Sequence, residues 1–176
     1  MGAGCLAGGM DRAELRSIQA PLRERYTVDP GSAHTPLRAT GDHRDDGVTC
    51  TVDGFAGPVR AGLHEATGGD GTDACSGDML LEALLACAGV TLRSVATAMD
   101  VELRDVRGVA ESSFDARGTL GVDRAAPVGI GPVTVTFTVD TDADDAVLER
   151  LAGSTGRYCV VGQSLREEPE VRVVRA

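Results

Sequence analysis

The sequence has 176 residues, of which 42% are hydrophobic, only 3% are aromatic and none is tryptophan. This length predicts one globular domain with a core built from Leu, Val and Ala. The formal charge of −10 at pH 7, with no run of Lys or Arg to offset it, would repel a phosphate backbone and excludes nucleic acid as an expected partner.

The N-terminal part predicts a tail followed by a helix. Residues 1–10 are rich in glycine and predict a disordered tail, without the basic and long apolar segments of a secretory signal, so we expect a cytoplasmic protein. Residues 11–35 predict a helix and a linker, with Asp11 as the N-cap of an amphipathic helix that reaches Tyr26. Its apolar residues recur at spacings of three and four: Leu15, Ile18 and Leu22.

The next segments predict an antiparallel meander and then a long helix. Gly and Asp residues separate three short strand-like segments at 35–40, 47–52 and 58–63. A flexible glycine-rich loop follows at 68–73, after which Ser76 is expected to cap a helix that runs to about Met99. This helix is apolar on nearly every side, which predicts burial by the domain or by a second chain. Charged residues inside it argue against a bilayer span.

The C-terminal half predicts further strands and helices, and the order of the elements indicates an α+β fold. The expected elements are a strand at 101–115, a turn region at 118–129, a strand at 133–139, a helix at 142–151, a short helix or turn at 158–165 and a closing strand at 170–174.

The five cysteines, an odd number, favour reduced thiols over a disulfide framework. For Cys87, in mid-helix among small residues, an inert core cysteine and a reactive thiol both stay open. Cys159 follows Arg157, which would lower the pKa of its thiol, so we expect it to be more exposed and more reactive than Cys87, with an inert role equally open. Cys75 is either an extra redox thiol or a plain loop residue, and neither Cys50 nor Cys5 is assigned a role.

No cofactor or metal is expected. The sequence contains no Cys-x-x-Cys pair and no histidine at ligand spacing, and His34, His43 and His64 fit ordinary polar surroundings. Phosphate-binding loops, dinucleotide fingerprints and hydrolase elbows are also missing from the sequence.

Two motifs, in the same order, resemble the OsmC/Ohr family of thiol peroxidases. The first is GGDGTD at 68–73 with SGDMLLEALLAC at 76–87, and the second is GRYCVVGQSL at 156–165. The similarity covers residues 36–176, which are expected to form an OsmC-like domain. The resemblance implies an intertwined homodimer in which antiparallel sheets wrap around long central helices and each site lies at the subunit interface.

The resemblance also implies an antioxidant activity. The Cys87 thiolate would attack the O–O bond of an organic hydroperoxide and become a sulfenic acid, which Cys159 would convert to a disulfide for reduction by a cellular dithiol. The family's thiolate-binding arginine maps to Arg44, with Arg38 and Arg60 as rivals. An apolar substrate pocket is expected from Leu80, Leu84 and residues of the partner chain.

Two departures from the family pattern keep other functions open. Gly77 stands where the peroxidases have a glutamate ten residues before the first cysteine, and Val160 stands where a proline often follows the second. The alternatives are a non-catalytic dimer that binds an apolar ligand, and a carrier that holds sulfur as a persulfide on one cysteine.

Overall fold

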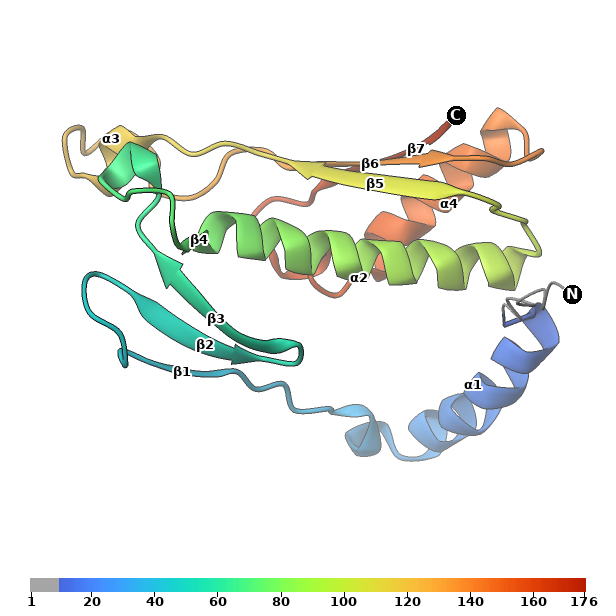
Figure 1. The fold of residues 1–176 in the computed structure, drawn as a ribbon. Coiled ribbons are helices and arrows are strands. Elements are labelled where there is room, and N and C mark those ends of the chain that lie inside the picture. The colour runs from blue at the N-terminus through green and yellow to red at the C-terminus, as the bar shows by residue number, and fades with distance from the viewer. Residues whose placement is uncertain (1–9) are drawn as a thin grey trace, which may run out of the picture.

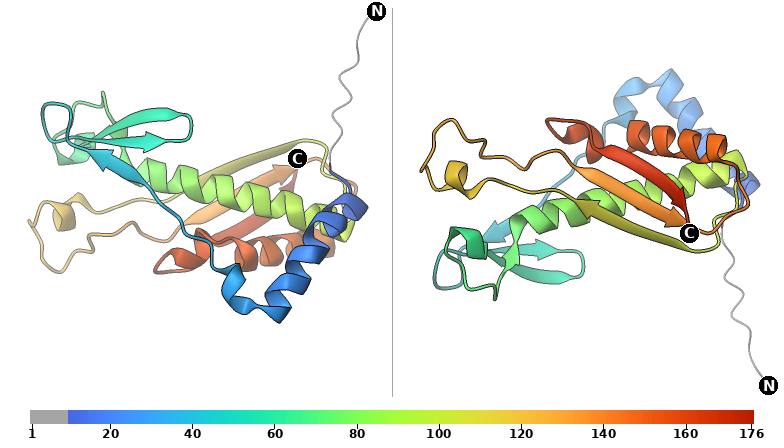
Figure 2. Two further views of the ribbon diagram at one scale, coloured as in Figure 1. Left: turned by 90° about the horizontal axis from the view of Figure 1, so that it is seen from below. Right: turned by 90° about the horizontal axis from the view of Figure 1, so that it is seen from above.

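A 24-residue helix, α2 (Ser76–Met99), is the central element of the computed structural model, which describes residues 10–176. A three-stranded sheet lies along one side of α2, and α4 (Asp145–Tyr158) packs beside α2 against the same face of that sheet (Figure 1). A second, four-stranded sheet lies near the N-terminal half of α2, apart from the first (Figure 2). The two sheets and four α-helices confirm the predicted α+β class.

The four-stranded sheet contains the predicted antiparallel meander. Its strands, in spatial order, are β1 (Thr40–Asp42), β2 (Cys50–Gly54), β3 (Gly57–Gly62) and β4 (Ala74–Cys75). The first three pair antiparallel, whereas β4 runs parallel to β3. The strand expected at 35–40 overlaps β1 only at Thr40. Pro36, near the start of the expected range, has no N–H to donate to a ladder. Thr51 is the one residue of these four strands that is buried.

Helix α1 (Arg12–Val28) has the predicted start but not a buried face. The Asp11 carboxylate accepts the N–H of Glu14 at 2.8 Å, and the Glu14 carboxylate accepts the N–H of Asp11 at 3.0 Å, which forms a capping box. The helix lies at the C-terminal end of α2, yet Ile18 remains 54% exposed (Figure 2). Nearly all of the predicted tail, residues 1–9, lies outside the described residues and stays a prediction.

One stripe of α2 is buried, and the opposite side is exposed. The stripe recurs every four residues, and each member is at most 1% exposed: Leu84, Ala88, Leu92 and Ala96. Val90, in contrast, is 73% exposed, so the chain itself buries only part of a helix that the sequence predicts to be buried on all sides. By length and composition alone α2 could cross a membrane, but the core helix of a soluble protein can have the same length and composition. The predicted cap is wrong by one residue: Cys75 is the N-cap, without a side-chain hydrogen bond, and Ser76 is the first helical residue.

The three-stranded sheet carries most of the core. β6 (Thr134–Val139) lies between β5 (Val106–Glu111), which is antiparallel to it, and β7 (Glu170–Arg175), which is parallel. Its inward residues Val135, Phe137 and Val139 are at most 2% exposed, which confirms the predicted alternation. On β5, a Cβ at Gly108 would come within 2.7 Å of the Phe137 ring and 2.8 Å of Leu85 Cδ1, so glycine leaves room for both side chains between the sheet and α2.

The remaining elements are short. They are a 3₁₀ helix at Pro30–Ala33, another at Glu65–Thr67, the one-turn helix α3 (Ala116–Thr119) in the predicted turn region, and a 3₁₀ helix at Gly162–Ser164 within the predicted 158–165 turn.

Candidate functional site

The packing of α4 against α2 brings Cys87 and Cys159 together. Cys87 is half-buried in the middle of α2, and Cys159 is the C-cap of α4 with 1% of its surface exposed. The two thiols lie side by side, each of them affects the pKa of the other, and neither is in a disulfide. Cysteines 72 positions apart in the sequence therefore form a reduced dithiol in the fold.

The turn after α4 fixes the position of the second thiol. The N–H of Cys159 donates to the carbonyl of Thr155 at 3.0 Å, and the N–H of Gly162 donates to the Cys159 sulfur at 3.3 Å. A Cβ at Gly162 would lie 3.4 Å from that sulfur and 3.5 Å from Cδ1 of Leu84. The glycine thus lets the turn press against α2 beside the dithiol.

The two thiols have opposite pKa shifts. Burial by itself raises the pKa of Cys87, but the nearby N–H of Val161, thiol of Cys159, N–H of Val160 and side chain of Thr91 together bring this pKa below its ordinary value. The Thr91 hydroxyl itself donates to the backbone carbonyl of Cys87. Burial raises the pKa of Cys159, with the neighbouring Cys87 acting in the same direction and the N–H of Gly162 against it. Cys87 is therefore the thiol that loses its proton first.

The expectation of an exposed, low-pKa Cys159 is wrong. Arg157 lies over the ring of Tyr158, with the guanidinium carbon 5.6 Å from the ring centroid. The Cys159 thiol instead faces the core, where desolvation disfavours its thiolate. Local sequence spacing does not show on which face of α4 the cysteine lies.

The predicted arginines are paired with carboxylates. Arg44 lies 2.6 Å from Asp42 and 3.2 Å from Asp53, and all three side chains are about half exposed. Arg60 is paired with Asp73. Within residues 10–176, no hydrogen bond or ion pair joins Arg44, Arg60 or Arg38 to a cysteine, so the thiolate-binding role of Arg44 stays a prediction.

The other cysteines lie apart from the dithiol. Cys50 is in β2 and Cys75 is at the start of α2, both half-buried and free, and Cys5 lies outside the described residues. A Cβ at Gly77 would lie 3.5 Å from the Cys75 sulfur, so the position of the family glutamate faces this thiol. The part of the chain that the structure describes holds no cluster of three or more side chains suited to a metal ion.

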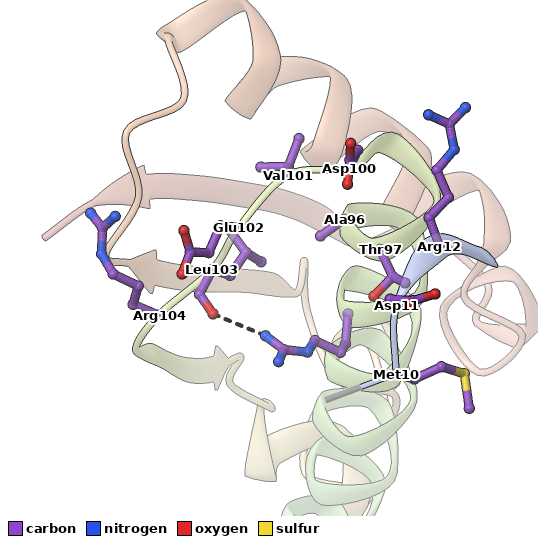
Figure 3. Close-up of a pocket in the computed structure, with 11 residues that line it drawn as sticks. Met10, Asp11, Arg12, Ala96, Thr97, Asp100, Val101, Glu102, Leu103 and Arg104 are labelled. Atoms are coloured by element: carbon purple, nitrogen blue, oxygen red, sulfur yellow. Dashed lines mark hydrogen bonds between the residues drawn. The ribbon is translucent and has the colours of Figure 1, made fainter. Parts of the chain in front are cut away.

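Two cavities lie along α2, and neither is lined by Cys87 or Cys159. One of about 500 Å³ lies between the start of α1 and the loop after α2, where Asp11, Asp100 and Arg104 are among its lining residues and no cysteine is (Figure 3). The other, of about 260 Å³, is mostly apolar and is lined by Leu80, seven residues before Cys87 on the same face of α2. Leu84, expected beside Leu80 in the pocket, is instead buried in the core of its own chain.

Sequence reasoning missed the hydrogen-bonding groups around the dithiol. Thr91 and Thr155 lie four residues from Cys87 and Cys159 respectively, and Gly162 supplies an N–H to the second sulfur. The spacing of four between Cys87 and Thr91 on one predicted helix was an available signal, whereas Thr155 and Cys159 lie beyond the helix predicted at 142–151.

Comparisons with known proteins identify the family and the fold of the chain. The family model described as OsmC-like protein matches residues 69–174. The fold is similar to an OsmC-like protein from Mycoplasma pneumoniae, with a TM-score of 0.61, 12% identity, and coverage of 81% of this chain and 95% of the other. It is also similar to the organic hydroperoxide resistance protein OsmC from Legionella pneumophila, with a TM-score of 0.59, 18% identity, and coverage of 82% of this chain and 98% of the other. A third similar structure is an organic hydroperoxide resistance protein from Elizabethkingia anophelis. Its TM-score is 0.63 at 13% identity, and the match covers 82% of this chain and 97% of the other. Among curated proteins, none matches.

Proposed function

The chain belongs to the OsmC-like protein family, and from this starting point we propose that it is a cysteine-based peroxidase that reduces organic hydroperoxides. The observation that carries the proposal is the dithiol itself: a thiol of lowered pKa, Cys87, beside a buried second thiol, Cys159. Two of the similar structures are named organic hydroperoxide resistance proteins, which supports the same chemistry.

The proposed cycle assigns one step to each thiol. The Cys87 thiolate attacks the distal oxygen of the hydroperoxide, the O–O bond breaks, and the alkoxide takes a proton to leave as the alcohol. Cys87 is then a sulfenic acid. The Cys159 sulfur attacks the Cys87 sulfur, the S–O bond breaks, and hydroxide takes the Cys159 proton to leave as water. A dithiol reductant restores both thiols and becomes a disulfide.

The surroundings of Cys87 favour its role as nucleophile. The peroxidatic thiol must be a thiolate near neutral pH, and the N–H groups of Val160 and Val161 lower the pKa of Cys87 in that direction. Cys159 needs no such activation in advance, because it reacts with a sulfenic acid held beside it. The apolar cavity at Leu80 fits the hydrocarbon part of an organic hydroperoxide.

A second copy of the chain is the proposed partner of α2. The exposed side of α2 carries Val90 at 73% exposure, and an apolar helix face of this kind is stable when another chain covers it. We propose a homodimer in the cytoplasm in which this side becomes buried. Arg44 then has a candidate role at the thiolate, but only after it leaves Asp42 and Asp53.

Peptide mapping tests the proposed cycle. The reduced protein is treated with one equivalent of cumene hydroperoxide, the remaining thiols are alkylated, and every cysteine peptide is identified by mass. A Cys87–Cys159 disulfide is expected, and Cys159→Ser should stop the reaction at a Cys87 sulfenic acid. Cys50→Ser is the matched control that keeps the disulfide. If both thiols stay free and alkylated in the natural chain, the peroxidase proposal is wrong.

A further inference from the structure

The hydroxyl of Thr155 has no hydrogen-bond partner, although the residue is fully buried. Among the buried side-chain nitrogen and oxygen atoms of residues 10–176, it alone is unsatisfied. Threonine in a helix ordinarily donates to the carbonyl four residues earlier, as Thr91 does to Cys87 and Thr27 does to Arg23, both at 2.8 Å. Thr155 lies in α4 and makes no such bond.

Stability alone does not explain this hydroxyl. A buried hydroxyl without a partner has lost its hydrogen bonds to water and gained none in return, so it destabilises the fold. Valine has nearly the same shape and would fill the position without this loss. An unsatisfied group in such a site calls for a function in another state of the protein.

The hydroxyl lies on the same face of α4 as the Cys159 thiol. The two residues are four positions apart, and the N–H of Cys159 donates to the carbonyl of Thr155 at 3.0 Å, so the helical geometry continues to Cys159. The Cys159 sulfur contacts the turn at Gly162, and Thr155 lies one helical turn before Cys159 on the same face of α4. Both side chains are at most 1% exposed, so water does not compete for the sulfur.

The Cys159 sulfur accepts a hydrogen bond from the N–H of Gly162 at 3.3 Å and still has room for another donor as its negative charge grows. A sulfur that attacks a sulfenic acid gives up its proton in a site that desolvates the thiolate. A hydroxyl that turns about its Cα–Cβ bond can supply the missing donor.

We propose that the Thr155 hydroxyl donates a hydrogen bond to the Cys159 sulfur while that sulfur attacks the sulfenic acid on Cys87. The inference rests on the proposed function. The S–S bond forms, the S–O bond of the sulfenic acid breaks, and the Cys159 proton leaves with the hydroxide as water. Thr155 keeps its own proton throughout, and it returns to its unpartnered state once the disulfide is reduced.

The test compares Thr155→Val with Thr155→Ser and with Thr141→Val. Thr141 is the matched control, because it is 5% exposed and its hydroxyl has a partner, the carbonyl of Glu102 at 2.7 Å. After rapid mixing with cumene hydroperoxide, quenched samples give the rates of sulfenic acid and disulfide formation by mass. Thr155→Val should form the sulfenic acid at an unchanged rate, form the disulfide about tenfold more slowly and melt no lower than the natural chain. Thr155→Ser should restore the rate.

Thr141→Val should do the reverse, with a lower melting temperature and an unchanged rate. Equal disulfide rates in the natural chain and Thr155→Val would overturn the inference, as would a loss of rate that tracks a loss of stability in both valine variants.

A second measurement separates this inference from the peroxidase proposal. In a Cys87→Ser background, thiolate absorbance near 240 nm reports the titration of Cys159, with Cys87→Ser/Cys159→Ser as the blank. Adding Thr155→Val should move that titration to higher pH by about one unit, because a donor to the thiolate is lost. No peroxide is involved, so a shift supports the role of Thr155 even if the natural chain forms no disulfide. An unchanged titration overturns it.

Discussion

Replacing Leu84 with alanine tests the contact between α2 and the turn that holds Cys159. Leu84 is 1% exposed, and its Cδ1 lies 3.5 Å from the position that a Cβ would take at Gly162. Leu84→Ala removes three buried carbons, worth about 0.8 kcal/mol each in transfer free energy, and leaves a cavity that adds to the cost. We expect the free energy of unfolding to fall by about 3–5 kcal/mol.

The loss should appear in both stability and reactivity. For a chain of this length, each kcal/mol corresponds to about 2–4 °C, so the melting temperature should fall by about 6–20 °C. Urea and thermal unfolding are measured at one protein concentration, since an oligomer's stability depends on concentration. Alkylation of Cys87 at pH 7 should also slow, because the loosened turn no longer holds the N–H groups of Val160 and Val161 against the sulfur.

Leu120→Ala is the control, because Leu120 is 56% exposed and its truncation should cost less than about 0.5 kcal/mol. A loss below about 1 kcal/mol for Leu84→Ala would refute the assignment of Leu84 to the core between α2 and the turn.

Three further predictions follow from the site and the exposed side of α2. The pH profile of iodoacetamide alkylation should have a lower midpoint for Cys87 than for Cys159, because the pKa of Cys87 lies below the ordinary value of a cysteine and that of Cys159 lies above it. The reverse order would contradict the assigned roles. Val90→Glu should convert a dimer to a monomer, as measured by light scattering, since a dimer would bury the carboxylate. Val122→Glu is the control, because Val122 is 74% exposed and the dimer should persist. A dimer that survives Val90→Glu places the interface elsewhere. Arg44→Ala should leave the melting temperature nearly unchanged, as expected for exposed ion pairs, while slowing the reaction of Cys87 with cumene hydroperoxide. An unchanged rate would remove Arg44 from the site.

Strong periodic patterns in the sequence identified most elements correctly. The alternation from 133 to 139 predicts β6, and the apolar run from 76 to 99 predicts α2. The helix expected at 142–151 instead runs from Asp145 to Tyr158. Gly153 and Gly156 lower helix propensity locally, but Leu148, Leu151 and Thr155 bury one face of this segment and outweigh it.

The identity of the two central cysteines was accessible from the sequence, but their environment was not. The motifs point to Cys87 and Cys159 through resemblance, and the fold places their thiols side by side. The pKa order, the unpartnered Thr155 hydroxyl and the N–H groups after α4 depend on how two helices pack across 72 residues of sequence. No local pattern encodes that packing, since it depends on which side chains meet across the helix pair.

The four-stranded sheet has a consequence for how the protein behaves when it is dilute. With Thr51 as its single buried residue, this sheet has no apolar core of its own, and Phe55 at its hairpin is fully exposed. A small sheet without a packed face is marginally stable in water. We therefore expect residues 40–75 to exchange amide hydrogens and to be cut by proteases sooner than β5, β6 and β7, and we expect both processes to slow as the protein is concentrated. Residues 40–75 would then be ordered only when the chains associate, and the lifetime of the protein in a cell would depend on how much of it is made.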